Sequence, residues 1–169
     1  MTHPRIFGSA FPIALALLAA ACGGTNAPAP TEATSAQGNA LVRVGDISVR
    51  ASPIQTSLLN PAVAQQYGIA RTDNTILLLV AVRQGPEASE TSLPAQITAS
   101  ATDLRGQKQA IAMREVRTGD PASGAGQVLI DYIGTVETAL PETLRFDVKA
   151  VRDGRPVATL QFNREFYPR

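Results

Sequence analysis

The chain contains no tryptophan and has only one cysteine and one histidine. The histidine is His3 and the cysteine is Cys22, so residues 39–169 contain neither residue type. This absence excludes Ser-His-Asp catalysis, Cys-His catalysis and histidine-ligated zinc from that region. A disulfide within the chain is excluded as well, because a second cysteine is absent. The cysteine pair and tryptophan that mark true immunoglobulin domains are also missing.

An excess of charge of one sign is lacking too. The 15 Lys and Arg residues nearly balance the 14 Asp and Glu residues, for a formal net charge of +1. This balance gives no electrostatic reason to expect nucleic acid as a partner. The sequence has no Gly-rich phosphate loop, no G-x-S-x-G motif and no calcium-loop spacing. We therefore expect no cofactor, no bound metal and no catalysis, although scattered Asp, Glu, Ser, Lys and Tyr residues leave an unrecognised hydrolase open.

The longest apolar stretch, residues 6–21, is too short to span a bilayer as a helix, which needs about 20 apolar residues with suitable flanks. It follows a short amino-terminal region that carries Arg5, and it ends in small residues. These features are typical of a cleaved secretory signal. The sequence therefore predicts a signal peptide at residues 1–21.

The segment Ala19-Ala20-Ala21-Cys22 resembles the lipobox of bacterial lipoproteins, in which the cysteine is lipidated. The resemblance implies lipidation at Cys22 and anchoring to a membrane. Ala19 and Ala21 also fit an A-x-A site, so cleavage by the ordinary signal peptidase stays open. Gly23 replaces the Asp that commonly retains such lipoproteins at the inner membrane. We expect a bacterial cell-envelope protein on the periplasmic face of the outer membrane, with the inner membrane as the alternative.

Residues 22–38 contain the predicted lipidation site and then mostly Gly, Pro, Thr, Ala and Ser, with one charged residue, Glu32. Such a segment has too little apolar surface to offset its conformational entropy. We expect a disordered tether here. The remaining residues, 39–169, have the length of one ordinary domain.

Alternation of apolar and polar residues is far more frequent in residues 39–169 than helical periodicity. Leu144 and Phe146 alternate with polar residues, as do Leu160 and Phe162, so these four side chains should share one core. Seven short strands are expected near residues 47–51, 75–83, 95–102, 107–117, 127–136, 144–148 and 160–163. The sequence predicts an all-β fold with one short helix, an immunoglobulin-like two-sheet β-sandwich of about seven antiparallel strands.

The short helix should occupy residues 61–67. Asn60 can cap it, Pro61 suits its first position and Gly68 can end it. Residues 76–82 are all apolar, so the strand that contains them must be covered on both faces. The helix or a crossing loop is expected to cover the outer face, and an exposed partner-binding patch is the alternative.

The densest polar cluster is Arg114-Glu115-Val116-Arg117, continuing to Asp120. Strand alternation places Arg114 on one face and Glu115 and Arg117 on the other. The cluster fits either a solvated strand end with cross-strand ion pairs or a contact site for an anion or a peptide. The candidate interaction residues are Arg71, Arg114, Glu115, Arg117, Asp120 and Tyr167.

Five separated motifs resemble one family of proteins. They are Asn60-Pro61-x-Val63-Ala64-x-x-Tyr67-Gly68-Ile69-x-Arg71, Leu104-x-Gly106-Gln107, Arg114-Glu115-Val116-Arg117-x-Gly119-Asp120, Glu142-Thr143-Leu144-Arg145-Phe146-Asp147 and Phe166-Tyr167-Pro168. Together they resemble the bacterial envelope proteins grouped as domain of unknown function family 4426. The resemblance covers the whole predicted domain and implies no particular activity.

Three functions remain open at this point. The sequence favours a non-catalytic interaction or accessory module, held near the membrane by lipid and contacting an envelope protein. A periplasmic binder of a small ligand or a peptide is the first alternative, and an unrecognised hydrolase is the second.

Overall fold

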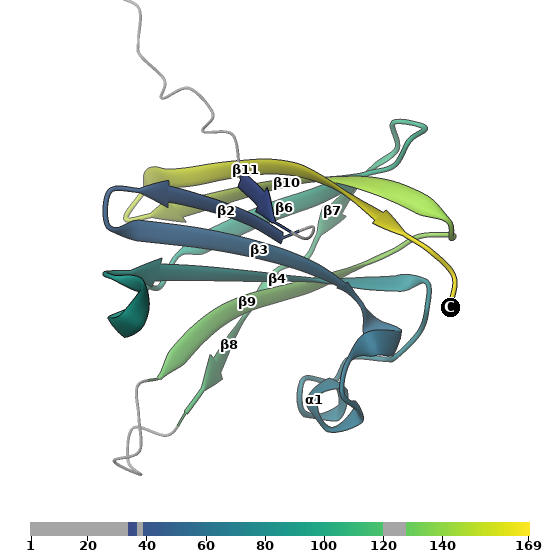
Figure 1. The fold of residues 1–169 in the computed structure, drawn as a ribbon, viewed down its shortest axis with the longest axis horizontal. Helices are drawn as coiled ribbons and strands as arrows, with labels where there is room; N and C mark the ends of the chain where they lie inside the picture. The colour runs from purple at the N-terminus through teal and green to yellow at the C-terminus, as the bar shows by residue number, and fades with distance from the viewer. Residues whose placement is uncertain (1–33, 37–38, 120–127) are drawn as a thin grey trace, which may run out of the picture.

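A computed structural model describes residues 34–36, 39–119 and 128–169, which form two antiparallel sheets packed face to face (Figure 1). The predicted all-β sandwich with one short α-helix is confirmed. The predicted signal peptide, the lipidation site Cys22 and the candidate Asp120 lie outside the described residues.

The larger sheet has seven strands. Its order is β1 (Thr34–Ala36), β2 (Asn39–Val44), β3 (Ile47–Gln55), β4 (Thr75–Gln84), β9 (Leu129–Glu137) and β8 (Arg114–Thr118), and β5 (Thr91–Ser92) also pairs with β4. The smaller sheet has four strands, in the order β11 (Arg155–Phe166), β10 (Glu142–Arg152), β6 (Gln96–Thr102) and β7 (Lys108–Ile111). The helices are α1 (Pro61–Gln66) and the 3-10 turns η1 (Thr56–Leu58) and η2 (Glu87–Ser89).

Alternating side chains from the two sheets meet in one core. The prediction that Leu144, Phe146, Leu160 and Phe162 share it is confirmed. Phe146 is completely buried and stacks on Phe162 with ring centroids 5.3 Å apart, and Phe166 meets Phe146 edge to face at 6.4 Å. These aromatic pairs add to the hydrophobic stabilisation that burial of their area provides.

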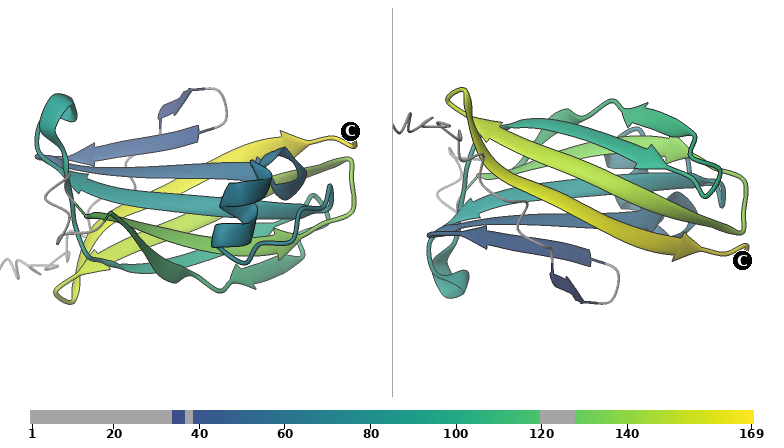
Figure 2. Two further views of the ribbon diagram at one scale, coloured as in Figure 1. Left: turned by 90° about the horizontal axis from the view of Figure 1, so that it is seen from below. Right: turned by 90° about the horizontal axis from the view of Figure 1, so that it is seen from above.

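The strand β4 is covered on both faces, as its composition requires. Every second side chain of this strand enters the core, namely Ile76, Leu78, Val80 and Val82. Leu77 points to the opposite face and is also buried. The helix α1 lies across this outer face (Figure 2, left). It begins as predicted, because the Asn60 side chain accepts a hydrogen bond from the Ala62 N–H at 2.9 Å. In the described part of the chain, no helix is long and apolar enough to cross a membrane.

The prediction of a single strand at residues 107–117 is wrong, because this stretch forms two strands, β7 and β8, in different sheets. The chain leaves the smaller sheet after β7 and enters the larger sheet at β8, so Ala112 and Met113 connect the two sheets. This crossing passes directly over Gly134 of β9. A Cβ atom there would lie 2.6 Å from Ile111 Cγ2 and 2.7 Å from the Ala112 carbonyl oxygen. The close approach explains why glycine occupies position 134.

The amino-terminal boundary of the folded region also needs correction. Residues 34–36 were expected in the disordered tether, but they form β1 and pair antiparallel with β2. A strand can add to a sheet edge through backbone hydrogen bonds alone, so polar composition does not prevent this pairing. The hairpin between β2 and β3 was not predicted, and Gly45 occupies the left-handed conformation in its turn, with φ of 63°.

Replacing Phe146 with alanine should lower the free energy of unfolding by about 3–5 kcal/mol, because it leaves a cavity beside two other aromatic rings. Leu104→Ala is the control, since Leu104 is 77% exposed and its truncation should change stability by less than about 0.5 kcal/mol. Urea unfolding followed by far-ultraviolet circular dichroism measures both variants. Equal stability of the two variants would contradict the described core.

Candidate functional site

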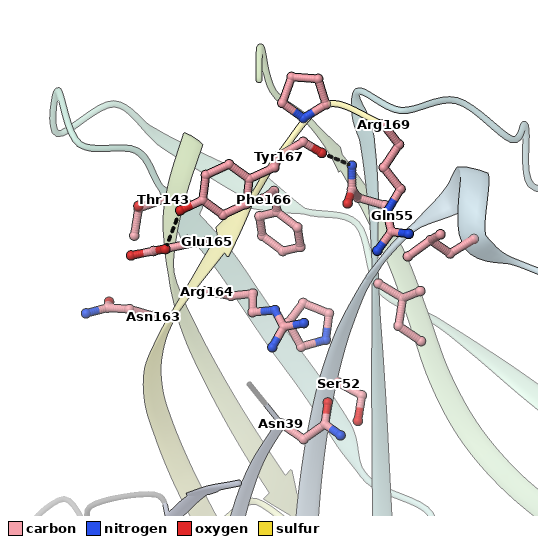
Figure 3. A pocket seen from close by; sticks show the side chains of 14 residues that line it. Asn39, Ser52, Gln55, Thr143, Asn163, Arg164, Glu165, Phe166, Tyr167 and Arg169 are labelled. Carbon is pink, nitrogen blue, oxygen red and sulfur yellow. Dashed lines mark hydrogen bonds between the residues drawn. The ribbon is translucent and has the colours of Figure 1, made fainter. Parts of the chain in front are cut away.

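A groove of about 1120 Å³ lies at one end of the sandwich, between β3 and β11 (Figure 3). Two segments form its sides. One is residues 52–55 of β3, and the other is residues 163–169, which include the end of β11 and the residues after it. Asn39, Leu58 and Thr143 complete the lining. We call this cavity the β3–β11 groove. It is large enough for a small molecule or a short peptide segment.

Among the residues that the structure describes, no strand pairs with this end of β3 on the groove side or with the outer edge of β11. Pairing of β2 with β3 stops at Ala40 and Ala51, whereas β3 continues to Gln55. The strand β11 pairs with β10 on one side and is an outer strand of its own sheet. The two sides of the groove are therefore two strand edges.

The side chain of Gln55 closes one end of the groove. Its Nε2 donates hydrogen bonds to the carbonyl oxygen of Tyr167 at 2.9 Å and to that of Asp73 at 3.3 Å. Gln55 is buried, so its amide is well shielded from competing water. This residue thus holds the segment after β11 against the end of β3 (Figure 3).

Arg164 is the most unusual side chain of the groove. Alternation along β11 places it on the face that Phe162 and Phe166 bury, and it is half-buried between them. Figure 3 shows its guanidinium reaching from β11 toward β3. Sequence reasoning did not identify Arg164, although an arginine between two inward-facing phenylalanines in an alternating strand was a visible signal.

Two of the predicted interaction residues bind main-chain carbonyls. Arg71 Nη2 donates to the Ser57 carbonyl oxygen at 2.7 Å, and Arg114 Nη2 donates to the carbonyl oxygen of Tyr67. The Tyr67 hydroxyl also lies 3.1 Å from Thr118 Oγ1. These bonds attach α1 and the segment after it to η1 and β8.

Glu115 and Arg117 form an ion pair on β8, with Arg117 Nε 2.6 Å from Glu115 Oε1. The hydroxyl of Tyr132 accepts the Ala95 N–H at 2.7 Å and donates to Glu115 Oε2 at 3.3 Å. Burial raises the pKa of Tyr132, so this phenol remains a hydrogen-bond donor at neutral pH. The Glu115–Arg117 ion pair joins two residues of the same strand, whereas the sequence predicted pairs between neighbouring strands.

Tyr167 lines the groove, and its hydroxyl donates to Glu165 Oε2 at 2.7 Å. This hydrogen bond raises the pKa of Tyr167. Arg71 and Arg117 do not line the groove. The structure therefore does not bring the described candidate residues together on one concave surface.

A smaller cavity of about 230 Å³ lies under the segment that follows α1. Residues 68–70 cover it, Leu77 and Ile133 form its floor, and Arg114 and Glu137 contribute charge. Its volume is below the usual range for ligand pockets, roughly 300–1,000 Å³. The β3–β11 groove is therefore the stronger candidate.

A charged cluster covers the other end of the larger sheet. Arg50 donates to both Glu90 carboxylate oxygens, at 2.7 and 3.1 Å, and Ser48 Oγ donates to Glu90 Oε1 at 3.0 Å. The hydrogen bond from Arg50 lowers the pKa of Glu90, against the opposing effect of burial. All three groups are mutually satisfied, so the cluster fastens η2 to the sheet.

Glu90→Gln should lower stability at neutral pH by about 1 kcal/mol, because the charge-assisted bonds to Arg50 are weakened. A carboxylate with a lowered folded-state pKa stabilises the fold above its unfolded pKa, near 4.5, and loses this contribution as pH falls through the folded value. The difference between wild type and Glu90→Gln should therefore shrink below about pH 4.5.

Urea unfolding at several pH values tests this expectation. Glu87→Gln is the matched control, since the Glu87 side chain is 77% exposed and its bond to Arg50 is longer, at 3.8 Å. Its effect should stay within about 0.5 kcal/mol at every pH. A Glu90→Gln effect that grows on acidification would contradict the pairing.

The arrangement of strands and groove defines the class of protein as a two-sheet antiparallel β-sandwich with an open end. Residues 41–169 match the model of the family described as domain of unknown function DUF4426. The chain belongs to this family.

A solved structure supports the same assignment. The crystal structure of a DUF4426 family protein from Pseudomonas aeruginosa PAO1 is 27% identical, with a TM-score of 0.58. The similarity covers 79% of this chain and 98% of that one. No curated protein matches the chain.

Proposed function

We propose that the chain is a non-catalytic interaction module of the bacterial cell envelope and that it recognises its partner in the β3–β11 groove. The single observation that carries this proposal is the groove itself, a large cavity between two strand edges. Binding sites are usually concave and mix apolar surface with a few convergent polar groups. Phe166, Arg164 and Gln55 supply that mixture here.

A non-catalytic role fits the chemistry of the described residues. Within residues 34–36, 39–119 and 128–169, no cluster of His, Cys, Asp or Glu could hold a metal ion. Glu90, a carboxylate with little exposure, is bonded to Arg50. Its lowered pKa favours the ionised form, whereas a general acid requires a raised pKa.

The proposed location is the membrane surface, through lipid attached to Cys22. The support is the sequence Ala19-Ala20-Ala21-Cys22 at the end of an apolar stretch of signal-peptide length. Several acyl chains would hold the protein firmly, because a single chain gives only marginal binding. The outer membrane is the proposed destination, since Gly23 follows the cysteine.

Cys22→Ser should abolish lipid attachment and release the protein from membranes, because the serine lacks the thiol that is acylated. Metabolic labelling with a fatty acid, followed by membrane fractionation, measures both effects. Thr25→Ser is the control and should retain label. An unlabelled wild-type protein whose mature amino terminus lies elsewhere would show that the ordinary signal peptidase acts instead.

A photo-cross-linking amino acid at Ser52 or Asn163, both of which line the groove, should capture a partner in intact cells. The same amino acid at Leu104, an exposed position outside the groove, is the control. Mass spectrometry of the products identifies the captured segment. Products that form equally from Leu104, or only with residues 1–33 of the chain itself, would contradict partner recognition in the groove.

A further inference from the structure

Three exposed apolar residues lie side by side where the strands of the smaller sheet end. Leu104 follows β6, Pro141 precedes β10 and Tyr167 follows β11, and β10 lies between the other two strands. Glu142 pairs with Phe166, so Pro141 and Tyr167 are the next residues outward on neighbouring strands. The Leu104 N–H donates to Glu142 Oε1 at 3.4 Å, which places Leu104 on the other side of β10. We call Leu104, Pro141 and Tyr167 the end patch.

The end patch presents apolar surface to the solvent. Leu104 is 77% exposed, Tyr167 is 59% exposed, and Pro141 is exposed as well. The Tyr167 carbonyl bonds to Gln55, but Figure 3 shows the ring of Tyr167 on the other side, beside Glu165. The patch is thus next to the β3–β11 groove and turned away from it. Large apolar side chains that gather on a surface mark a contact site.

Leu104 is held in place by the turn that carries it. Asp103 Oδ1 accepts the backbone N–H of Arg105 at 2.9 Å and that of Gln107 at 2.8 Å. The Arg105 side chain also pairs with Asp103, with Nη2 3.1 Å from Oδ2. Because the turn is already ordered, Leu104 can be buried against a partner with little loss of conformational entropy.

The chemistry of the end patch suits the interface of a lipid bilayer. Leucine favours the acyl chains, and tyrosine is enriched at membrane surfaces because its ring is apolar and its hydroxyl is polar. The side chain of Arg105 is 71% exposed next to Leu104, so its guanidinium can bind a lipid phosphate. This combination favours phospholipid as the occupant.

The proposed lipid attachment also brings a bilayer within reach of the end patch. Through β2, Thr34 of β1 lies level with Arg50 of β3. Gln55, which ends β3 beside the patch, is five residues further along, or about 17 Å. Cys22 precedes Thr34 by twelve positions, which span at most about 40 Å. Acyl chains at Cys22 can therefore lie in the same bilayer that the patch contacts.

We infer that the end patch rests on the phospholipid bilayer, with Leu104 and Tyr167 between the headgroups and the acyl chains. This inference rests on the proposed lipid attachment, which supplies the bilayer, and it adds the orientation of the domain. The β3–β11 groove lies at the same end of the sandwich, so a partner bound there is held close to the membrane.

The test uses the absence of tryptophan from the chain, because a single introduced tryptophan then reports only its own surroundings. Full-length Leu104→Trp and Tyr167→Trp proteins are purified with their acyl chains and placed in phosphatidylcholine vesicles. Bromine on the lipid acyl chains quenches tryptophan on contact, so both proteins should lose about half or more of their fluorescence. Val44→Trp is the control, since Val44 is 46% exposed and ends β2 at the opposite end of the sandwich. It should lose less than about a tenth.

A second substitution tests whether the apolar side chain causes the contact. Leu104→Asp in the Tyr167→Trp protein should remove most of the quenching, because a charged side chain opposes entry into the bilayer. Leu129→Asp in the same protein is the control. Leu129 is also exposed but begins β9 at the opposite end, so its replacement should leave the quenching unchanged.

Four results would overturn the inference: equal quenching of Val44→Trp, no quenching of Leu104→Trp, no quenching of Tyr167→Trp, or quenching that survives Leu104→Asp. A blue shift of the emission without quenching would show a protein, such as a second copy of the chain, on the end patch and would overturn it too.

Mass spectrometry of the purified protein separates this inference from the proposal on which it rests. A protein without acyl chains at Cys22 contradicts the lipid attachment and the inference together. An acylated protein whose end-patch tryptophans are not quenched contradicts the orientation alone.

Discussion

The need to bury both faces of β4 organises this domain. A strand without a polar face must have packed side chains on each side, because exposed apolar surface is unfavourable in water. The smaller sheet covers one face with the cluster of Phe146, Phe162 and Phe166. The helix α1 and the segment after it cover part of the other face.

The cover on the outer face explains what two conspicuous arginines do. Helix α1 has six residues and would not persist as an isolated helix. Arg71 and Arg114 bind carbonyls of η1 and of Tyr67, and these bonds hold α1 in place. Residues that resembled a recognition cluster in the sequence therefore have a structural use. The groove lies elsewhere, where β3 extends beyond β2.

Strand positions, core residues and the helix start could be predicted from the sequence because each depends on local patterns. The alternation of Leu144 and Phe146, and the cap formed by Asn60, are examples. The crossing at residues 112–113 could not be predicted, because neither Ala112 nor Met113 is a turn residue. The crossing depends on its contact with Gly134, which is remote in the sequence.

The candidate site was less predictable for a related reason. Whether the guanidinium of an arginine binds a carbonyl of its own chain depends on where distant carbonyls lie, as for Arg71 and Ser57. Arg164 occupies an inward position that alternation does reveal. The groove beside Arg164, however, depends on where β2 stops, and alternation does not reveal that point.

The crossing at residues 112–113 also makes the two long edges of the sandwich unequal. At the edge formed by β7 and β8, two residues of continuous chain fix the separation of the sheets. At the opposite edge, the described parts of β2, β3 and β11 are joined only by noncovalent contacts, among them the bond from Gln55 to Tyr167. The amide of Gln55 thus ties the segment after β11 to the end of β3 at an edge where no loop joins these described strands.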